Sequence, residues 1–176
     1  VVIVDDHHIF RAGLRAELGD ALEVLGEAAT VDEAVAMIPE LRPDVVLLDV
    51  HLPGGEGGGG AEVVQRLAAS PAAVATKFLA LSVSDAADDV VRVIRSGARG
   101  YLTKTASGRE VAEAARRVHG GDAVFSPRLA GFVLDAFTGR TPEAAPAAAA
   151  GVGEPGADDE LDRLSARLGA WLQGQG

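Results

Sequence analysis

Residues 44–64, DVVLLDVHLPGGEGGGGAEVV, contain the pattern from which the fold of the whole chain can be predicted. An apolar run ends on a carboxylate, Asp49, passes through Pro53 and enters a tract that is almost entirely glycine. A short apolar run between turn residues is typical of a strand buried on both faces of a parallel sheet. The acid that ends this strand and the glycine tract after it both need an explanation.

Short apolar runs alternate with helical patterns along the first two thirds of the chain. The predicted strands cover residues 1–5, 21–28, 44–49, 77–82 and 98–102. The predicted helices cover residues 8–18, 31–38, 61–69, 85–96 and 108–119. Thr30 and Glu33 form a capping-box pattern, and Pro39 predicts the end of that helix. Five successive βα units imply right-handed crossovers and an α/β fold, with a doubly wound five-stranded parallel sheet covered on both faces.

The regular alternation weakens after Gly120, which suggests four segments. Residues 1–120 form the main domain, and residues 121–137 are expected to be a helical extension. Residues 138–157 have the Ala, Pro and Gly composition of a linker. Residues 158–176 predict a short amphipathic helix, whose apolar face comprises Leu161, Leu164, Leu168, Trp171 and Leu172.

Composition and charge exclude several classes of function. The formal net charge is −10 over 176 residues, which repels nucleic acids and anionic membranes, so this chain itself is not expected to bind either. Its apolar runs are too short for a membrane span or the core of a signal peptide. The absence of cysteine excludes disulfides and thiolate metal sites and is compatible with a reducing compartment.

Polar side chains gather at the predicted carboxyl ends of the strands, where ligands bind in open parallel sheets. These side chains belong to Asp5, Asp6, Asp49, Ser82 and Lys104. Crowded carboxylates repel one another unless a cation lies between them, and oxygen ligands suit Mg²⁺. Each residue by itself has an ordinary role as a turn, cap or solvated side chain. Together, a metal, an ammonium and a hydroxyl are suited to hold a phosphoryl group.

The glycine tract does not match a known phosphate-binding loop. A Walker A loop requires Lys and then Ser or Thr after its last glycine, and neither follows Gly60. A dinucleotide fingerprint would follow the first strand, which is followed here by DDHHIF. The remaining interpretations are slack chain or a flap over the acidic site. The high conformational entropy of glycine favours slack, mobile chain.

The two histidines after the first strand are candidate metal ligands with Asp5 and Asp6. Adjacent residues at a helix start point in different directions, so we do not expect His7 and His8 to act as a ligand pair.

Three stretches resemble the receiver domain of a two-component response regulator, of the NarL/LuxR-type subfamily that carries a helix-turn-helix. They are VDDHHIFRAGL (4–14), DVVLLDVHLP (44–53) and LALSVSDAADDVVRVIRSGARGYLTK (79–104). The resemblance extends over residues 1–120 and implies a flavodoxin-like, CheY-like sheet. One departure is the loop between Pro53 and Glu62, whose eight residues make it longer than the family pattern.

The resemblance also implies roles for individual residues. Asp49 would be the phosphoacceptor, and Asp5, Asp6, Asp49 and the backbone carbonyl of His51 would bind Mg²⁺. Lys104 and Ser82 would bind phosphoryl oxygens, with Tyr101 as the aromatic switch residue. His51 and Ser84 would flank the hydrolytic water and tune dephosphorylation.

The function implied is that of a cytoplasmic signalling switch rather than a turnover enzyme. A sensor histidine kinase would supply the phosphoryl group. The domain would assist its own phosphorylation and lose the group slowly. Phosphorylation would switch the self-association of the domain, with a homodimer as the associated state. The output surface would comprise residues 85–119. LDRLSARL (161–168) resembles the start of a LuxR-type DNA-binding domain, the rest of which is missing from this chain.

Two other functions remain open. A receiver-like interaction module that works without phosphorylation is compatible with the long loop. A Mg²⁺-dependent phosphohydrolase of the haloacid dehalogenase type is disfavoured, because it needs an Asp two residues after the nucleophile, where this chain has His51.

Overall fold

The computed structural model describes residues 1–134 except 74, 85, 127–128 and 132, and it has the predicted α/β architecture. The strands are β1 (Val2–Val4), β2 (Gly26–Ala28), β3 (Val45–Asp49), β4 (Lys77–Ser82) and β5 (Gly100–Thr103). The α-helices are α1 (His8–Leu18), α2 (Val31–Leu41), α3 (Gly59–Ala68), α4 (Ala87–Arg95) and α5 (Gly108–Gly120). The strands form one parallel sheet in the order β2-β1-β3-β4-β5.

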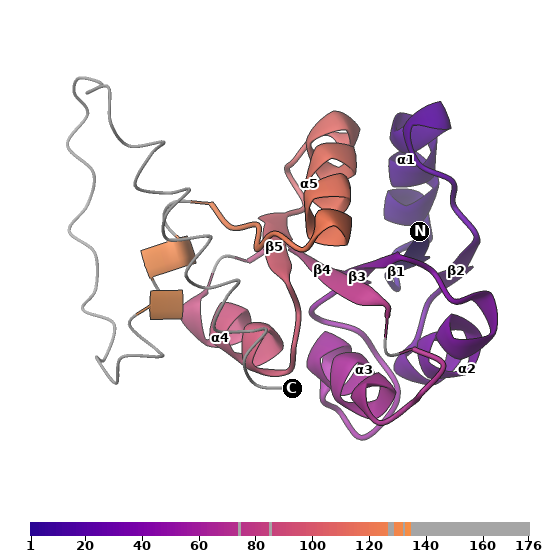
Figure 1. Ribbon diagram of the computed structural model, residues 1–176, viewed down its shortest axis with the longest axis vertical. Helices are drawn as coiled ribbons and strands as arrows, with labels where there is room; N and C mark the ends of the chain where they lie inside the picture. Colours follow the sequence, from indigo (N-terminus) through magenta and orange to yellow (C-terminus); the bar gives the residue numbers. More distant parts are fainter. Residues whose placement is uncertain (74, 85, 127–128, 132, 135–176) are drawn as a thin grey trace.

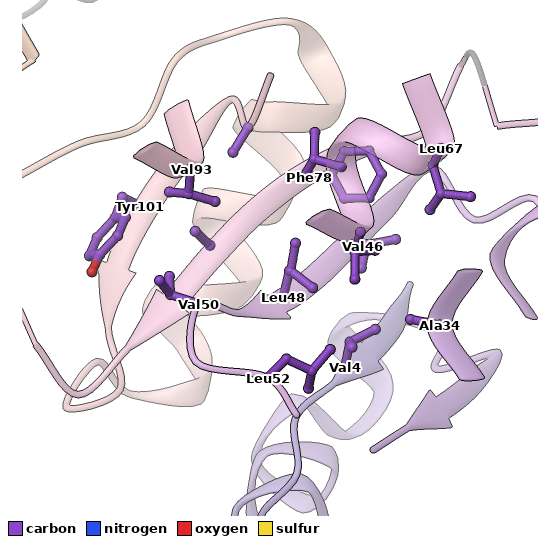
Figure 2. Packing of buried hydrophobic residues seen from close by; sticks show 14 of the residues in the cluster. Val4, Ala34, Val46, Leu48, Val50, Leu52, Leu67, Phe78, Val93 and Tyr101 are labelled. Atoms are coloured by element: carbon purple, nitrogen blue, oxygen red, sulfur yellow. The ribbon is translucent and has the colours of Figure 1, made fainter. Parts of the chain in front are cut away.

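The sheet separates two apolar cores. Helices α1 and α5 cover one face, and α2, α3 and α4 cover the other (Figure 1). Along β3, Val46 and Leu48 belong to the larger core shown in Figure 2, whereas Val45 and Leu47 belong to the smaller one. This alternation follows from the two-residue period of a strand, and it explains why the whole run is apolar.

Helix α2 differs from the prediction at both ends. Thr30 Oγ accepts a hydrogen bond from Glu33 N at 3.2 Å, but the Glu33 carboxylate accepts from Ala29 N at 2.7 Å rather than from Thr30. The helix also continues through Pro39 to Leu41, so the prediction that Pro39 ends it was wrong. Pro39 lies in the last turn, where its missing N–H removes a single helical hydrogen bond.

Strand β2 is shorter than predicted. Only Gly26–Ala28 pair with β1, and Gly19–Ala21 form a 3₁₀ turn, so the strand expected over residues 21–28 was too long. The partner strand explains this difference, because β1 offers only Val2–Val4 for pairing, in register with the three residues of β2.

The chain beyond α5 continues along the free edge of β5. Tyr101 N donates to Val124 O at 2.8 Å, and Val124 N donates to Arg99 O at 3.0 Å. Residues 129–131 and 133–134 are helical, and Leu129 and Val133 are buried in the core that contains Tyr101. The helical extension predicted for residues 121–137 therefore begins with an extended segment.

The expected linker (138–157) and amphipathic helix (158–176) lie outside the described residues. Within the described part of the chain, every helix is too short or too polar to span a membrane.

Candidate functional site

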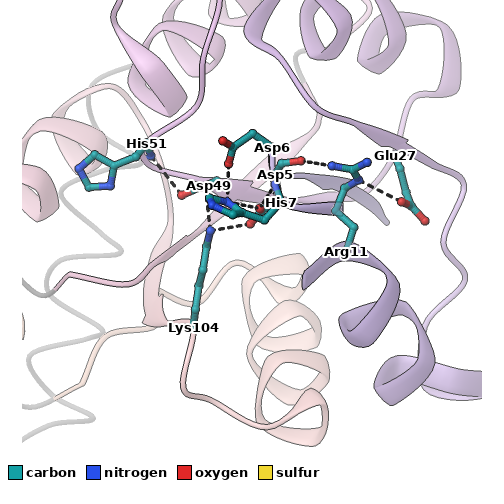
Figure 3. A network of polar contacts seen from close by, with 8 residues as sticks. All are labelled: Asp5, Asp6, His7, Arg11, Glu27, Asp49, His51 and Lys104. Carbon is teal, nitrogen blue, oxygen red and sulfur yellow. Dashed lines mark hydrogen bonds and ion pairs between the residues drawn. The ribbon is translucent and has the colours of Figure 1, made fainter. Parts of the chain in front are cut away.

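The carboxyl ends of β1 and β3 bring three aspartates together at the point where the strand order reverses. Asp5 follows β1 directly and Asp49 is the last residue of β3; their exposed fractions are 1% and 3%. Asp6 is exposed beside them (Figure 3). The sequence therefore correctly predicted that these acids share one site.

Lys104 follows β5 directly and extends across the sheet edge to two of these acids. Its Nζ lies 2.8 Å from Asp49 Oδ2 and 2.7 Å from Asp5 Oδ2 (Figure 3). The same Nζ lies 4.9 Å from the centre of the Phe10 ring. Burial lowers the pKa of the Lys104 ammonium, but its contacts with Asp49 and Asp5 outweigh burial and raise the pKa above its ordinary value of 10.5. The ammonium therefore stays charged at neutral pH.

The acidic cluster has the donor set of a Mg²⁺ site. Ligand atoms of Asp5, Asp6, His7 and Asp49 lie within 4.8 Å of one another. Asp5 Oδ2 is buried, and the Lys104 ammonium lies 2.7 Å from it. Crowded carboxylate oxygens of this kind are suited to a hard cation. The part assigned to the His51 carbonyl stays a prediction.

His7 lies closer to the acids than the sequence argument suggested. Its Nδ1 is 2.6 Å from Asp6 Oδ1, and its backbone N–H donates to Asp5 Oδ1 at 2.9 Å. The imidazole therefore contacts the outer side of the acidic cluster. In the sequence, the signal for this contact was the run of three residues, Asp5 to His7, at the end of a strand.

The side chain of His51 pairs with helix α4. His51 N donates to Asp49 Oδ1 at 3.1 Å, while His51 Nε2 lies 3.2 Å from Asp89 Oδ2. Asp89 Oδ1 also accepts from Arg92 at 3.0 Å. Sequence reasoning missed both Asp89 and Arg92, because acids and bases on a helix usually only contact solvent.

The residues predicted to act in switching, Ser82 and Tyr101, are linked through Ser84. Ser82 is fully buried, and its Oγ accepts from Ser84 N at 3.2 Å. The Tyr101 hydroxyl donates to Ser84 O at 2.8 Å, and its ring is buried in the core. The Tyr101 ring therefore lies inside the core, and residue 84 connects it to Ser82.

The glycine loop is folded around a carboxylate, so the interpretation as slack chain was wrong. Glu62, which is 8% exposed, accepts from Glu56 N at 2.9 Å and from Gly58 N at 3.0 Å. These backbone hydrogen bonds, together with Arg66, hold the pKa of Glu62 below its ordinary value. Gly55 N donates to Asp32 Oδ2 at 3.1 Å, which ties the loop to α2.

Two glycines of the tract form the first turn of α3, which begins at residue 59 rather than 61. Gly59 has a φ of 58°, and a Cβ there would lie 2.5 Å from Val50 O. Gly60 N donates to Val50 O at 3.0 Å. This close approach holds α3 against the backbone that follows Asp49.

Comparison with known proteins agrees with this geometry. The family model described as the response regulator receiver domain matches residues 1–116. The chain belongs to this family. It is a receiver domain, a signalling module rather than an enzyme of metabolism, and the resemblance seen in the sequence is confirmed.

Similar regulators and solved receiver structures support the assignment. The chain is 37% identical over 132 residues to the response regulator GacA of Pseudomonas viridiflava, covering 74% of this chain and 59% of that protein. It is 35% identical over 136 residues to the transcriptional regulatory protein LiaR of Bacillus subtilis, covering 76% and 62%. The chain thus spans about three fifths of the length of these curated relatives.

Two solved structures share the fold at appreciable identity. A LuxR-family response regulator from Aurantimonas sp. SI85-9A1 aligns with a TM-score of 0.68 and 28% identity, covering 78% of this chain and 96% of that chain. The signal receiver domain of the putative response regulator NarL from Mycobacterium tuberculosis aligns with a TM-score of 0.62 and 33% identity, covering 68% and 94%. The receiver is therefore of the LuxR/NarL type.

Proposed function

We propose that Asp49 accepts a phosphoryl group from the phosphohistidine of a sensor kinase. The observation that carries the proposal is the position of Lys104 Nζ, 2.8 Å from the buried Asp49 and 2.7 Å from the buried Asp5. A bound Mg²⁺ would be held by Asp5, Asp6 and Asp49 and would neutralise charge on the phosphoryl group.

The residues of this chain have separate tasks in the transfer. An Asp49 carboxylate oxygen forms the new bond to phosphorus, while the bond from phosphorus to the donor breaks and its electron pair leaves with the donor. The Lys104 ammonium, which contacts the Asp49 carboxylate before the transfer, then binds a phosphoryl oxygen instead. Ser82 gives up its contact with Ser84 N to bond another oxygen, and the linked Tyr101 transmits this change toward α4 and β5.

Phosphorylation would in turn switch the self-association of the domain, with a homodimer as the associated state. In the longer regulators that this chain resembles, this change would control transcription through a LuxR-type DNA-binding domain. The cytoplasm is the compartment in which such a kinase and regulator would meet. Light scattering with and without Mg²⁺ and beryllofluoride, a phosphoryl mimic, tests the self-association step.

Intact-protein mass spectrometry tests the phosphorylation step. Incubation with a small phosphodonor and Mg²⁺ should add one phosphoryl group to wild type and none to Asp49→Asn. Asp20→Asn, a change at an exposed aspartate in the 3₁₀ turn, is the matched control and should react like wild type. The absence of an adduct with every donor would favour a module that works without phosphorylation, and multiple turnover of a phosphate ester would favour a phosphohydrolase.

A further inference from the structure

A cavity of about 350 Å³ lies next to the acidic cluster. Its lining includes Asp6 and His51, Gly57, Gly58 and Gly59 of the glycine loop, and Arg92 of α4. Its volume is at the lower end of the range of about 300–1,000 Å³ for small-molecule sites. Neither Asp49 nor Lys104 is among its lining residues, so the cavity adjoins the phosphoacceptor but does not hold the transferred phosphoryl group.

The wall made by the glycine loop depends on the absence of side chains. A Cβ on Gly58 would lie 2.7 Å from the Glu62 Cβ, and one on Gly59 would lie 2.5 Å from Val50 O. A Cβ on Gly57 would meet no protein atom within 4 Å. The loop therefore presents bare backbone to the cavity, and its shape is fixed by the hydrogen bonds to Glu62.

Arg92 gives the cavity a positive charge in a strongly negative region. Its guanidinium donates to Asp89 Oδ1 at 3.0 Å, and Asp89 Oδ2 lies 3.2 Å from His51 Nε2. Asp89 thus positions the side chains of both Arg92 and His51, which line the cavity. A guanidinium has five N–H donors in a planar fork, so a nitrogen held by Asp89 leaves others suited to a carboxylate.

An anionic group that approaches this site meets strong repulsion. Asp5, Asp6 and Asp49 are close together, and the net charge of the chain is −10. Lys104 is engaged with Asp5 and Asp49 on the inner side, whereas Arg92 lies on the cavity side. Arg92 should therefore stabilise the reaction most for a phosphodonor whose leaving group is an anion.

We propose that this cavity binds the departing carboxylate of an acyl phosphate donor, with Arg92 as the residue that selects it; the inference rests on the proposed phosphorylation of Asp49. An Asp49 oxygen bonds to phosphorus, the bond between phosphorus and the acyl oxygen breaks, and the electron pair stays on the carboxylate. No proton transfer is required. Arg92 stabilises the negative charge that develops on this carboxylate.

Two donors that differ in their leaving group test the proposal. Acetyl phosphate releases an anionic carboxylate, whereas phosphoramidate releases ammonia once its nitrogen is protonated. With Mg²⁺ present, Arg92→Ala should lower the second-order rate constant for acetyl phosphate by about three- to tenfold, the loss of one partly exposed charged contact. The rate with phosphoramidate should stay within about twofold of wild type on the same grounds.

Control variants separate this role from a structural one. Arg92→Lys should recover part of the acetyl phosphate rate, and Arg95→Ala, one turn along α4, should leave both rates unchanged. Beryllofluoride, which has no leaving group, should bind Arg92→Ala and wild type with the same Kd. Weaker beryllofluoride binding, equal slowing with both donors, or no slowing with acetyl phosphate would overturn the inference. Wild type that reacts with neither donor would instead overturn the proposed function.

Discussion

The ammonium of Lys104 lies within ion-pair distance of two carboxylates that are almost completely buried. The sequence placed Lys104 near Asp49 because both follow strands of one parallel sheet. It did not reveal that one ammonium contacts both Asp5 and Asp49, because this depends on how far a flexible side chain extends across the edge. Asp89 was missed for a similar reason, since its role appears only when α4 lies beside residue 51.

Replacing Lys104 by Met should destabilise the domain in the absence of Mg²⁺. The change leaves two buried carboxylates without their cation, which should lower the free energy of unfolding by about 2–4 kcal/mol. Added Mg²⁺ should restore part of that loss, because it binds the same acids. Urea unfolding with and without Mg²⁺ measures both effects, and a Lys104→Met domain as stable as wild type in metal-free buffer would contradict the ion-pair account.

The lowered pKa of Glu62 predicts a defined pH dependence. Hydrogen bonds from Glu56 N and Gly58 N favour the ionised form in the folded state. The resulting stability is fully present above the unfolded-state pKa, near 4.5, and is lost as the pH falls through the lower folded-state pKa. Glu62→Gln should therefore be less stable than wild type at pH 7, and the difference should shrink in acid.

Chemical unfolding of both proteins across the acid range checks this prediction. Glu40→Gln, at an exposed position in α2, is the matched control and should show no such pH-dependent difference. A difference between Glu62→Gln and wild type that stays constant down to strongly acidic pH would show that the carboxylate does not hold the loop.

At the scale of elements, the periodic helices and buried strands could be predicted, whereas their ends could not. Helix α2 passes Pro39 because its last turn tolerates one missing hydrogen bond, and β2 is short because its partner is short. The glycine loop was expected to be slack because its composition indicates a high entropic cost of ordering. Composition does not reveal which group binds the loop backbone and offsets that cost. That group is Glu62, whose carboxylate lies beneath backbone N–H groups.

The segment after α5 belongs structurally to β5, and removing it should be costly. A chain ending at residue 120 loses the Val124 pairing and the burial of Leu129 and Val133. Compared with a chain ending at residue 137, it should lose about 2–5 kcal/mol of unfolding free energy, the value of two or so buried apolar side chains. Urea unfolding of the two chains measures this difference.

The same pair of chains reports on the environment of Tyr101. Neither contains the one tryptophan, Trp171, so Tyr101, the one tyrosine, dominates the fluorescence of both. Acrylamide should quench it more strongly in the shorter chain, because Leu129 and Val133 no longer cover that core. Equal stability and equal quenching would show that the segment does not hold Tyr101 inward.

At the scale of the whole molecule, topology explains why chemistry gathers at one edge. The strand order reverses between β1 and β3, and ligands bind at such a point in open parallel sheets, which is where Asp5 and Asp49 lie. Alternating strand and helix patterns predicted a parallel sheet covered on both faces, whereas the flavodoxin-like topology was implied by the family resemblance. The pairing of residues 123–124 with β5 was not predictable, because an irregular segment carries no periodic signal.

The central claim is that Asp49 forms an aspartyl phosphate with the help of Mg²⁺. Borohydride reduces an aspartyl phosphate to homoserine, and peptide mass spectrometry then locates the changed residue. After reaction with a small phosphodonor and Mg²⁺, homoserine should occur at position 49 and should be nearly absent when the metal is chelated. Homoserine at position 5 or 6, or at no position in the chain, would contradict the account.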